Sequence, residues 1–563
     1  MIAVRYHEAT KHHFNRFARS LGYLDWATQP DPFRRYGDAP FHHLPRVAAG
    51  LGRASGVDPG ALGTADVPYS WLYEQHVAAY PIDQHSIGEF LRCSMGLSAW
   101  KQYGQSRWSL RVNPSSGNLH PTEAWIVHDG RVCHYAPREH GLEERCLFES
   151  PAARTLKVRA TDDDYFLVAL TSIIWREAWK YGERAFRYCQ HDVGHAVGAL
   201  RFAAALLGWR LQLLPGWSDA QIAALLGLDR DADYEDAERE EAECIALVSA
   251  SPGFGIRDSG LDPTALVAAV RAGVWSGRAN RLSSERVDWP IIDEVAVATR
   301  YPGPGISESR TFEPRTSEFR PSEPRTHGSR VPDPGSPIPT PAAPAARQII
   351  LQRRSALAFD PRGVLERETL FRMLGRLHPP APPWDAIYWP PHVHLVLFIH
   401  RVHDLTPGIY AYLRDPALLD EWRAAMRAEF MWEAVTTSTG EPARLFLLVP
   451  IDARRIANRV SCDQDIAEDG FFGLAMISRF AEPLREHGEW FYRRLFWECG
   501  LIGQLLYLEA EAAGARSTGI GCYYDDPVHE LLGLSGDEWQ NLYHFSMGLP
   551  IEDTRLTAEA IEW

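Results

Sequence analysis

The sequence lacks the features that would direct a chain into a membrane or onto a nucleic acid. No run of about 18 apolar residues occurs, and residues 1–7 contain no apolar signal core. Acidic residues outnumber basic residues, so the formal net charge is −15 and the sequence pI is about 5.8. We therefore expect a cytoplasmic protein whose main partner is neither a nucleic acid nor a membrane, although a local basic pocket for a phosphate is compatible with this balance.

Closely spaced cysteines are also missing. The eight cysteines include no Cys-x-x-Cys pair, and several of them lie within apolar helical patterns. Thiols in such positions are usually buried rather than joined in disulfides or bound to a metal. We therefore expect buried thiols in this chain. The eight positions are 93, 133, 146, 189, 244, 462, 499 and 522.

The chain has the length and composition of a globular protein with at least two domains, because it contains 563 residues with 45% hydrophobic and 23% charged content. Residues 1–68 are rich in aromatic residues and proline without long periodicity, which indicates an ordered arm that wraps a neighbouring domain. Residues 301–346 contain 11 of the 40 prolines and no apolar periodicity. They are typical of a disordered or polyproline-like linker, and a motif for a proline-reading partner is the alternative. The two predicted domains then span residues 69–300 and 347–563.

Apolar periodicity predicts the main elements of both domains. Spacings of three and four residues indicate helices, and short apolar or alternating runs indicate strands. The predicted helices span residues 87–100, 183–207 and 365–377. The predicted strands span residues 124–127, 166–170, 393–399 and 445–449.

A set of residues recurs at a constant offset of 306 positions, as Gly194 and Gly500 show. The set covers a helix, the loop after it and the next helix, so chance does not account for it. We predict a tandem duplication of one α+β unit that forms an intramolecular pseudo-dimer. The first members of the set are Glu183, Arg187, Gly194, Leu200, Ala204, Gly208, Arg210 and residues 225–228. Their counterparts are Glu489, Arg493, Gly500, Leu506, Ala510, Gly514, Arg516 and residues 531–534.

Two short motifs, one in each half, carry the chemistry. The first, called the glycine turn here, consists of Pro114, Ser115, Ser116, Gly117 and Asn118. Its backbone can approach a flat ligand closely and donate hydrogen bonds to the ligand's edge. An ordinary turn before a strand is the alternative interpretation.

The second motif, called the arginine motif here, consists of Arg353, Arg354 and Ser355. Two guanidinium groups beside a hydroxyl match a phosphate, whereas an exposed helix end with two solvated arginines is the alternative. The first half has no arginine motif at its start, and residues 383–391 of the second half contain no glycine turn. We therefore expect one complete composite site and one vestigial site.

Together the two motifs resemble the FMN site of nitroreductase-like flavoproteins, in which these two elements come from different subunits of a dimer. The branch that looks most similar is the SagB-type dehydrogenases, the azoline oxidases of peptide natural-product pathways. The resemblance covers the chain from about residue 80 in two copies. It is carried by residues 116–123, 175–188, 192–195, 353–360 and 519–521.

The resemblance implies a role for each site residue. The arginine motif would hold the phosphate, ribityl chain and pyrimidine edge of FMN, and the glycine turn would pack against and hydrogen-bond the ring. The backbone at Gly519, Ile520 and Gly521 would face the reactive N5 and part of the phosphate end, with Arg516 as an additional cation. The family often has a third basic residue where this chain has Leu357, so flavin affinity would be lower unless Arg516 compensates.

Lys180 and Tyr181 match a Lys-Tyr pair that serves substrate deprotonation in the azoline-oxidase branch. A lysine acts as a base when burial lowers its pKa, and a tyrosine relays a proton or stabilises an oxyanion. The alternative is a surface lysine that caps a loop beside a packed tyrosine. His191 and His195 have the i, i+4 spacing of metal ligands. Because Asp192 lies between them and no third ligand is near, we interpret them as core or loop-contact histidines.

These observations predict an FMN-dependent oxidoreductase that transfers hydride between a substrate carbon and flavin N5. The substrate would be a small molecule or a peptide-derived group. One alternative is a reductase that uses NAD(P)H to reduce a nitroaromatic compound or a quinone. Another is a non-catalytic flavin-binding or scaffold protein.

Overall fold

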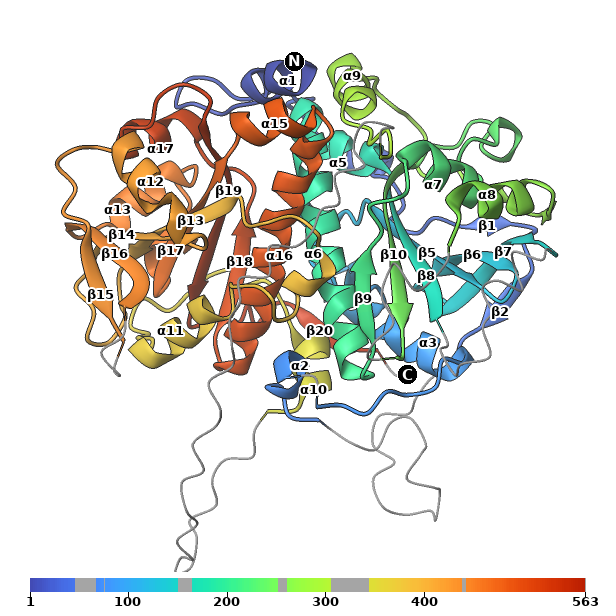
Figure 1. Ribbon diagram of the computed structural model, residues 1–563, viewed down its shortest axis with the longest axis horizontal. Coiled ribbons are helices and arrows are strands. Elements are labelled where there is room, and N and C mark those ends of the chain that lie inside the picture. Colours follow the sequence, from blue (N-terminus) through green and yellow to red (C-terminus); the bar gives the residue numbers. More distant parts are fainter. Residues whose placement is uncertain are drawn as a thin grey trace, which may run out of the picture.

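The computed structural model describes residues 1–45, 67–74, 76–149, 165–251, 261–304, 344–437 and 442–561. Two halves lie side by side, each built on one antiparallel sheet, and two long helices lie between the sheets (Figure 1). These helices are α6 (Ala185–Leu206) and α16 (Phe491–Ala512). Both are almost completely buried, because each packs against its own sheet and against the other helix.

The sheet of the first half has the strand order β11-β7-β6-β5-β8-β10-β9, and β2 pairs with β7. Its strands are β2 (Phe41–His43), β5 (Thr122–His128), β6 (Arg131–Ala136), β7 (Gly141–Leu147), β8 (Tyr165–Ser172), β9 (Arg210–Leu213), β10 (Glu241–Ser249) and β11 (Val274–Trp275). The other helices of this half are α1 (Ile2–Ala9), α2 (Trp71–Glu74), α3 (Gln84–Arg92), α5 (Ile174–Tyr181), α7 (Asp219–Leu226), α8 (Pro263–Arg271) and α9 (Pro290–Ala298).

The sheet of the second half has the strand order β15-β16-β14-β13-β17-β19-β18. Its strands are β13 (Val393–Ile399), β14 (Gly408–Tyr412), β15 (Glu433–Thr436), β16 (Pro442–Pro450), β17 (Phe472–Arg479), β18 (Arg516–Ile520) and β19 (Trp539–Gly548). The other helices are α10 (Ala346–Gln352), α11 (Arg367–Gly375), α12 (Leu419–Ala425), α13 (Arg454–Val460), α14 (Ile466–Asp469), α15 (Ala481–His487) and α17 (Asp525–Leu532).

Five strands of each sheet follow the same path. The series β6-β5-β8-β10-β9 in the first sheet corresponds to β14-β13-β17-β19-β18 in the second, and α6 and α16 occupy the same place in the two connections. This confirms the predicted tandem duplication of an α+β unit with an antiparallel sheet.

The two halves meet where α6 crosses α16, and glycine makes the close approach possible. A Cβ atom added to Gly194 would lie 2.2 Å from the carbonyl oxygen of Trp497, and one added to Gly500 would lie 2.2 Å from that of His191. Both distances are below van der Waals contact, so only glycine fits at either position. Because Gly194 and Gly500 are counterparts in the repeat, the crossing is symmetric about the axis that relates the two halves.

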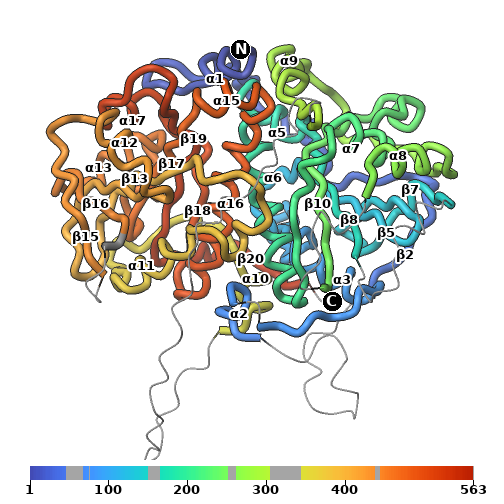
Figure 2. The backbone as a smooth tube through the Cα atoms, viewed as in Figure 1, coloured from blue at the N-terminus to red at the C-terminus, as the bar shows by residue number. Residues whose placement is uncertain are grey.

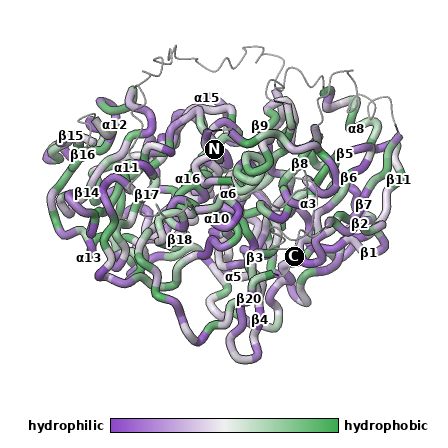
Figure 3. The backbone as a smooth tube through the Cα atoms, turned by 90° about the horizontal axis from the view of Figure 1, so that it is seen from below, coloured by the Kyte–Doolittle hydropathy of each residue, from purple (hydrophilic) through white to green (hydrophobic). Residues whose placement is uncertain are grey.

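Both ends of the chain contact the opposite half. In the N-terminal arm, the Ala3 amide donates to a Glu489 carboxylate oxygen of the second half at 2.6 Å, and the Tyr6 hydroxyl donates to the Glu183 carbonyl oxygen of its own half at 2.7 Å. Figure 2 shows this end beside α15 and α9. At the other end, β20 (Thr557–Ala560) pairs with β3 (Leu97–Tyr103), which pairs with β4 (Ser106–Arg111) (Figure 3). The arm also adds β1 (Tyr36–Gly37), which pairs with β12 (Arg278–Ala279).

One predicted helix is wrong in its second part. Residues 87–100 were expected to be helical throughout, but α3 ends at Arg92 and β3 begins at Leu97. The chain turns sharply at Gly96, where a Cβ atom would lie 2.7 Å from the Arg92 carbonyl oxygen. The segment after it becomes a strand because β4 and β20 provide hydrogen-bond partners on both sides. The other predicted helices and strands are confirmed within a few residues of their expected bounds.

Most of the proline-rich segment, residues 305–343, lies outside the described residues, as do residues 46–66 of the predicted arm. The ends of the proline-rich segment are packed, since the Tyr301 amide donates to Asp219 at 2.9 Å and the Tyr69 amide donates to the Pro344 carbonyl oxygen at 3.0 Å. Among the described residues, no helix combines the length and apolar character that a membrane crossing needs.

A buried histidine in the first sheet gives a testable pH dependence. His134 lies between Glu143 at 2.9 Å and Glu123 at 3.1 Å; burial lowers its pKa, but the two carboxylates outweigh this and raise the pKa to about 9. The ion pairs of protonated His134 therefore stabilise the fold fully below pH 6.5, the ordinary pKa of histidine. This stabilisation is lost as the pH rises through 9. Over that range we expect the free energy of unfolding to fall by about 3 kcal/mol more in the natural chain than in the His134→Gln variant. Urea titrations at several pH values measure this difference, and parallel pH curves for the two proteins would contradict it.

Candidate functional site

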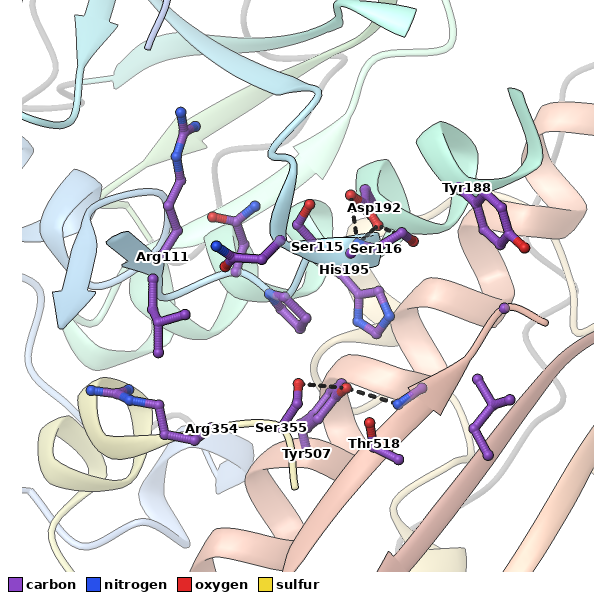
Figure 4. Close-up of a pocket in the computed structure, with 18 of the residues that line it drawn as sticks. Arg111, Ser115, Ser116, Tyr188, Asp192, His195, Arg354, Ser355, Tyr507 and Thr518 are labelled. Atoms are coloured by element: carbon purple, nitrogen blue, oxygen red, sulfur yellow. Dashed lines mark hydrogen bonds between the residues drawn. The ribbon is translucent and has the colours of Figure 1, made fainter. Parts of the chain in front are cut away.

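A cavity of about 410 Å³ lies between the two halves, which is within the usual range of ligand pockets. Figure 4 shows its two walls, with residues of the first half such as Ser115 and Asp192 facing Ser355 and Tyr507 of the second. Leu556, close to the end of the chain, also lines it. The cavity is therefore composite, as the sequence predicts.

The glycine turn forms part of the first wall and includes a short 3-10 helix, Ser116–Asn118. Gly117 has a φ of +58°, and a Cβ atom there would lie 2.6 Å from the Tyr181 hydroxyl. Both the backbone conformation and the space therefore require glycine.

Hydrogen bonds to three partners fix the glycine turn in place. Asp192 of α6 accepts from the Ser116 amide at 3.0 Å and from the Ser116 hydroxyl at 3.0 Å. The Ser115 hydroxyl accepts from the His120 amide at 2.8 Å, and the Asn118 carboxamide donates to the Ser109 carbonyl oxygen at 2.9 Å.

The arginine motif follows α10 and forms part of the second wall. Arg353 donates to the carbonyl oxygens of Arg111 at 3.1 Å and Val112 at 3.0 Å, and Arg354 donates to that of Ser98 at 3.0 Å. Both side chains thus reach from one half to the other. Burial lowers the pKa of Arg353, and burial together with the neighbouring Arg353 lowers that of Arg354 to about 10.

Neither Arg353 nor Arg354 forms an ion pair with a carboxylate among the described residues, although the Glu511 carboxylate, which accepts from the Arg354 amide at 3.0 Å, attracts both guanidinium groups. Such a concentration of buried guanidinium groups is suited to an anionic ligand, because both groups keep their charge at neutral pH and present planar donors. This favours the phosphate-site interpretation of the motif over an exposed helix end.

Tyr507 of α16 links the arginine motif to the end of β18, and sequence reasoning missed it. Its hydroxyl lies 3.0 Å from the Ser355 hydroxyl and accepts from the Gly519 amide at 2.8 Å. The counterpart of Tyr507 in the repeat is Arg201, which pairs with Asp385 instead. The difference between these two positions, Tyr507 and Arg201, is a signal that a comparison of the two copies could have used.

The end of β18 approaches aromatic rings so closely that it requires glycine. A Cβ atom on Gly519 would lie 2.0 Å from the Tyr543 hydroxyl, and one on Gly521 would lie 2.1 Å from the Tyr188 ring. Ile520 lies between them and also lines the cavity. All three residues therefore line the cavity.

Twelve of the predicted site residues line the cavity, whereas Lys180 and Arg516 do not. Lys180 lies next to it, with its Nζ atom 5.1 Å from the centroid of the Tyr181 ring. Arg516 is paired with Glu511 at 3.5 Å and Glu552 at 2.5 Å. These carboxylates compensate its charge, so the structure gives less support to Arg516 as an additional phosphate ligand.

The titratable groups that line the cavity include Asp192, Tyr181 and His195. Burial raises the pKa of Asp192 to about 7 and that of Tyr181 well above its ordinary range, so Tyr181 stays protonated at neutral pH. His195, interpreted from sequence as a core or loop-contact residue, is buried but lines the cavity, 3.2 Å from the Tyr543 hydroxyl. Burial lowers its pKa to about 3, which makes it a neutral hydrogen-bonding group.

The position related to this cavity by the repeat is nearly filled. A space of about 10 Å³ remains there, lined by Leu214, the counterpart of Ile520, and by Arg494, the counterpart of Tyr188. Trp217, Tyr388 and Trp497 line the same space. As bounded by the described residues, this space holds no more than about one water molecule, which is far too small for a flavin.

The composite cavity, by contrast, fits a flavin nucleotide in size and in chemistry. Several polar atoms of its lining residues are buried without a hydrogen-bond partner among the described residues, namely Asn113 Oδ1, His120 Nδ1, His195 Nδ1 and Arg353 Nε. Buried polar atoms are normally satisfied, which indicates that a polar ligand supplies the missing partners.

Comparisons with known proteins agree with this geometry. The sequence pattern of the nitroreductase family matches residues 78–237 and 350–549. A protein of Anabaena variabilis, provisionally assigned as a nitroreductase, aligns over 98% of this chain and 99% of its own with 20% identity and a TM-score of 0.65. A search of curated proteins found no match.

Two further solved structures align over part of the chain. One is a Ralstonia eutropha protein, also provisionally assigned as a nitroreductase, with 16% identity over 40% of this chain and 89% of its own, and a TM-score of 0.25. The other is the Escherichia coli microcin synthetase McbBCD complex with truncated pro-MccB17 bound, with 15% identity over 44% of this chain and 83% of its own, and a TM-score of 0.26.

The family pattern covers more than half of the chain, with one match in each half. The Anabaena variabilis structure shows the same overall fold across both halves. Members of this family are oxidoreductases that generally bind a flavin. This chain, with two copies of the fold, belongs to the nitroreductase family.

Proposed function

We propose that this protein is an FMN-dependent oxidoreductase with one FMN site per chain. The observation that carries the proposal is that the glycine turn and the arginine motif, from different halves, line the same cavity. Arg353 and Arg354 would bind the phosphate, and Ser355 would bind the ribityl chain and the pyrimidine edge. The glycine turn and the backbone at Gly519, Ile520 and Gly521 would contact the ring system.

A bound FMN would supply the hydride exchange with a substrate carbon. The chain's own residues would orient the substrate and move its proton. Tyr181 remains protonated because burial raises its pKa, so its hydroxyl is suited to donate a hydrogen bond to the substrate. Lys180 Nζ lies beside the Tyr181 ring and the glycine turn, where it would accept the proton that leaves the substrate.

We further propose the oxidative direction, a dehydrogenase similar to the SagB-type azoline oxidases, acting on a small-molecule or peptide-derived substrate. The support is the match of residues 175–188 to that branch together with the position of Lys180 and Tyr181 at the cavity edge. Proton removal by a lysine is a step that a dehydrogenase of this type needs.

The visible absorption spectrum of the purified protein tests the cofactor and its stoichiometry. We expect a flavin spectrum and, after heat release, about one FMN per chain, because among the described residues only one of the two related positions has space for it. Two FMN per chain would contradict the single site, and none after addition of FMN would leave a scaffold protein. Rapid bleaching by NAD(P)H alone would favour a nitro- or quinone reductase over the dehydrogenase.

Replacement of Arg354 by alanine tests the phosphate contact. A hydrogen bond to a charged group contributes about 1.5–3 kcal/mol, so we expect the Kd for FMN to rise roughly tenfold to hundredfold. Fluorescence titration of the apoprotein with FMN measures the change. The matched control is Arg362→Ala, because Arg362 is an exposed residue paired with Asp360. Equal FMN affinity in the Arg354→Ala variant and the natural chain would remove Arg354 from the site.

A further inference from the structure

Two of the eight cysteines differ from the others. Six are buried as expected, but Cys462 and Cys522 are half-buried, and their Sγ atoms lie 2.8 Å apart although no disulfide joins them. Cys462 comes just after α13, and Cys522 follows the end of β18. The pair is thus formed only in the folded chain, from residues sixty positions apart.

The surrounding residues hold the two sulfur atoms together. The Gln464 carboxamide donates to the Ser461 carbonyl oxygen at 2.7 Å and to the Cys522 carbonyl oxygen at 3.0 Å, which ties the two loops to each other. His12 of the N-terminal arm packs over the pair, with its Nδ1 atom 3.9 Å from Cys522 Sγ. Cys522 also lines the composite cavity and is only half-buried.

The two thiols are chemically unequal. The hydrogen bond between the two sulfur atoms lowers the pKa of Cys522; burial opposes this, and the nearby Arg184 guanidinium lowers the pKa further. The same hydrogen bond raises the pKa of Cys462. Cys522 lines the composite cavity and Cys462 does not, so Cys522 is placed to attack an incoming disulfide and Cys462 to resolve the product.

We propose that Cys462 and Cys522 form a redox-active thiol pair that reduces low-molecular-weight disulfides and closes into an intramolecular disulfide. The Cys522 thiolate attacks one sulfur of the small disulfide, so a mixed disulfide forms and the first small thiolate leaves. Cys462 gives up its proton and attacks Cys522 Sγ, which expels the second small thiolate. Two electrons and two protons pass from the protein thiols to the small disulfide, which becomes two free thiols. The site works through the chain's own sulfur atoms and does not depend on a bound flavin.

A metal site is the competing interpretation, because His12, Cys462 and Cys522 place their ligand atoms within 4.8 Å of one another. Two thiolates that bind one tetrahedral zinc ion at about 2.3 Å lie roughly 3.8 Å apart. The observed 2.8 Å is well below that separation, so the geometry favours a bond between the sulfur atoms over a shared metal ion.

The experiment uses the full-length chain, reduced with dithiothreitol, freed of reductant and then incubated with oxidised glutathione. After alkylation of the remaining thiols, intact mass and peptide mapping identify the cysteines that reacted. We expect two fewer alkylated cysteines per chain and a covalent link between the peptides that contain Cys462 and Cys522. In the Cys462→Ser variant we expect one glutathione to remain on Cys522, because the resolving thiol is absent.

The Cys522→Ser variant separates the attacking thiol from the resolving thiol, and we expect it to react with oxidised glutathione at least tenfold more slowly than the Cys462→Ser variant. Cys93→Ser is the control for a buried thiol and should behave like the natural chain. The proposal is overturned if all eight thiols of the natural chain remain free. It is also overturned if the purified protein contains one zinc ion per chain that is lost in the Cys462→Ser variant.

Discussion

Replacing Lys180 by alanine is expected to lower turnover by at least about a hundredfold while leaving the FMN content per chain unchanged, since general acid–base groups typically contribute factors of this size. Lys180 does not line the cavity, so its loss should not disturb cofactor binding. Its Nζ atom nevertheless lies beside the Tyr181 ring, within reach of a substrate that contacts Tyr181. The measurement is turnover with an artificial electron acceptor, together with the visible spectrum of the same preparation.

The Lys180→Arg variant distinguishes a proton-transfer role of Lys180 from a purely electrostatic role. An arginine keeps the cation but does not release a proton at neutral pH. We expect Lys180→Arg to be as slow as Lys180→Ala. Recovery of turnover in the arginine variant would assign Lys180 an electrostatic role, and full turnover in the alanine variant would remove it from the mechanism. Arg271→Ala is a suitable control, because this exposed residue pairs with Asp229 away from the cavity.

Alanine at Gly500 is expected to destabilise the protein by about 3 kcal/mol or more, at the upper end of the cost of overpacking a core. The added methyl group would lie 2.2 Å from the His191 carbonyl oxygen and 2.7 Å from Gly194 Cα. Both atoms belong to the backbone of α6, so no side-chain rotation relieves the contact. The two helices would have to separate, and the cavity between the halves would change with them. Denaturant titration measures the loss of stability.

Gly194→Ala should have a similar effect, because Gly194 occupies the counterpart position and faces the Trp497 carbonyl oxygen. Gly375→Ala is the matched control, since nothing lies within 4 Å of a Cβ atom there and the residue is the last of α11. Alanine has the higher helix propensity, so we expect no loss of stability in this control. A Gly500→Ala variant as stable as the control would show that the crossing tolerates a side chain.

Much of the fold could be predicted because the same unit occurs twice in the sequence. Gly194 and Gly500 mark the same position in the two copies, and the two sheets share a strand order because the same unit is repeated. The glycine turn and the arginine motif were identifiable for a similar reason. Each is a short run of neighbouring residues whose chemistry is visible without knowing what lies opposite.

The error at residues 87–100 has a tertiary cause. Local periodicity continues past Arg92, but β4 and β20 offer hydrogen bonds to the segment after Gly96, and β20 lies more than four hundred residues away in the chain. A strand with such distant partners is hard to predict from its own residues, because its stability comes from the pairing rather than from local conformational preference.

By itself, the sequence determined that two copies of one unit lie in tandem and that only one set of complementary motifs survives. Only the tertiary structure decided which side chains meet, both between the copies and within the second copy. Tyr507 joins Ser355 to Gly519, Arg353 reaches the carbonyl oxygens of the opposite half, and Cys462 lies against Cys522. The physical reason is that each of these contacts joins separate chain segments, whose distance in space is set by tertiary packing and is not encoded by spacing along the sequence.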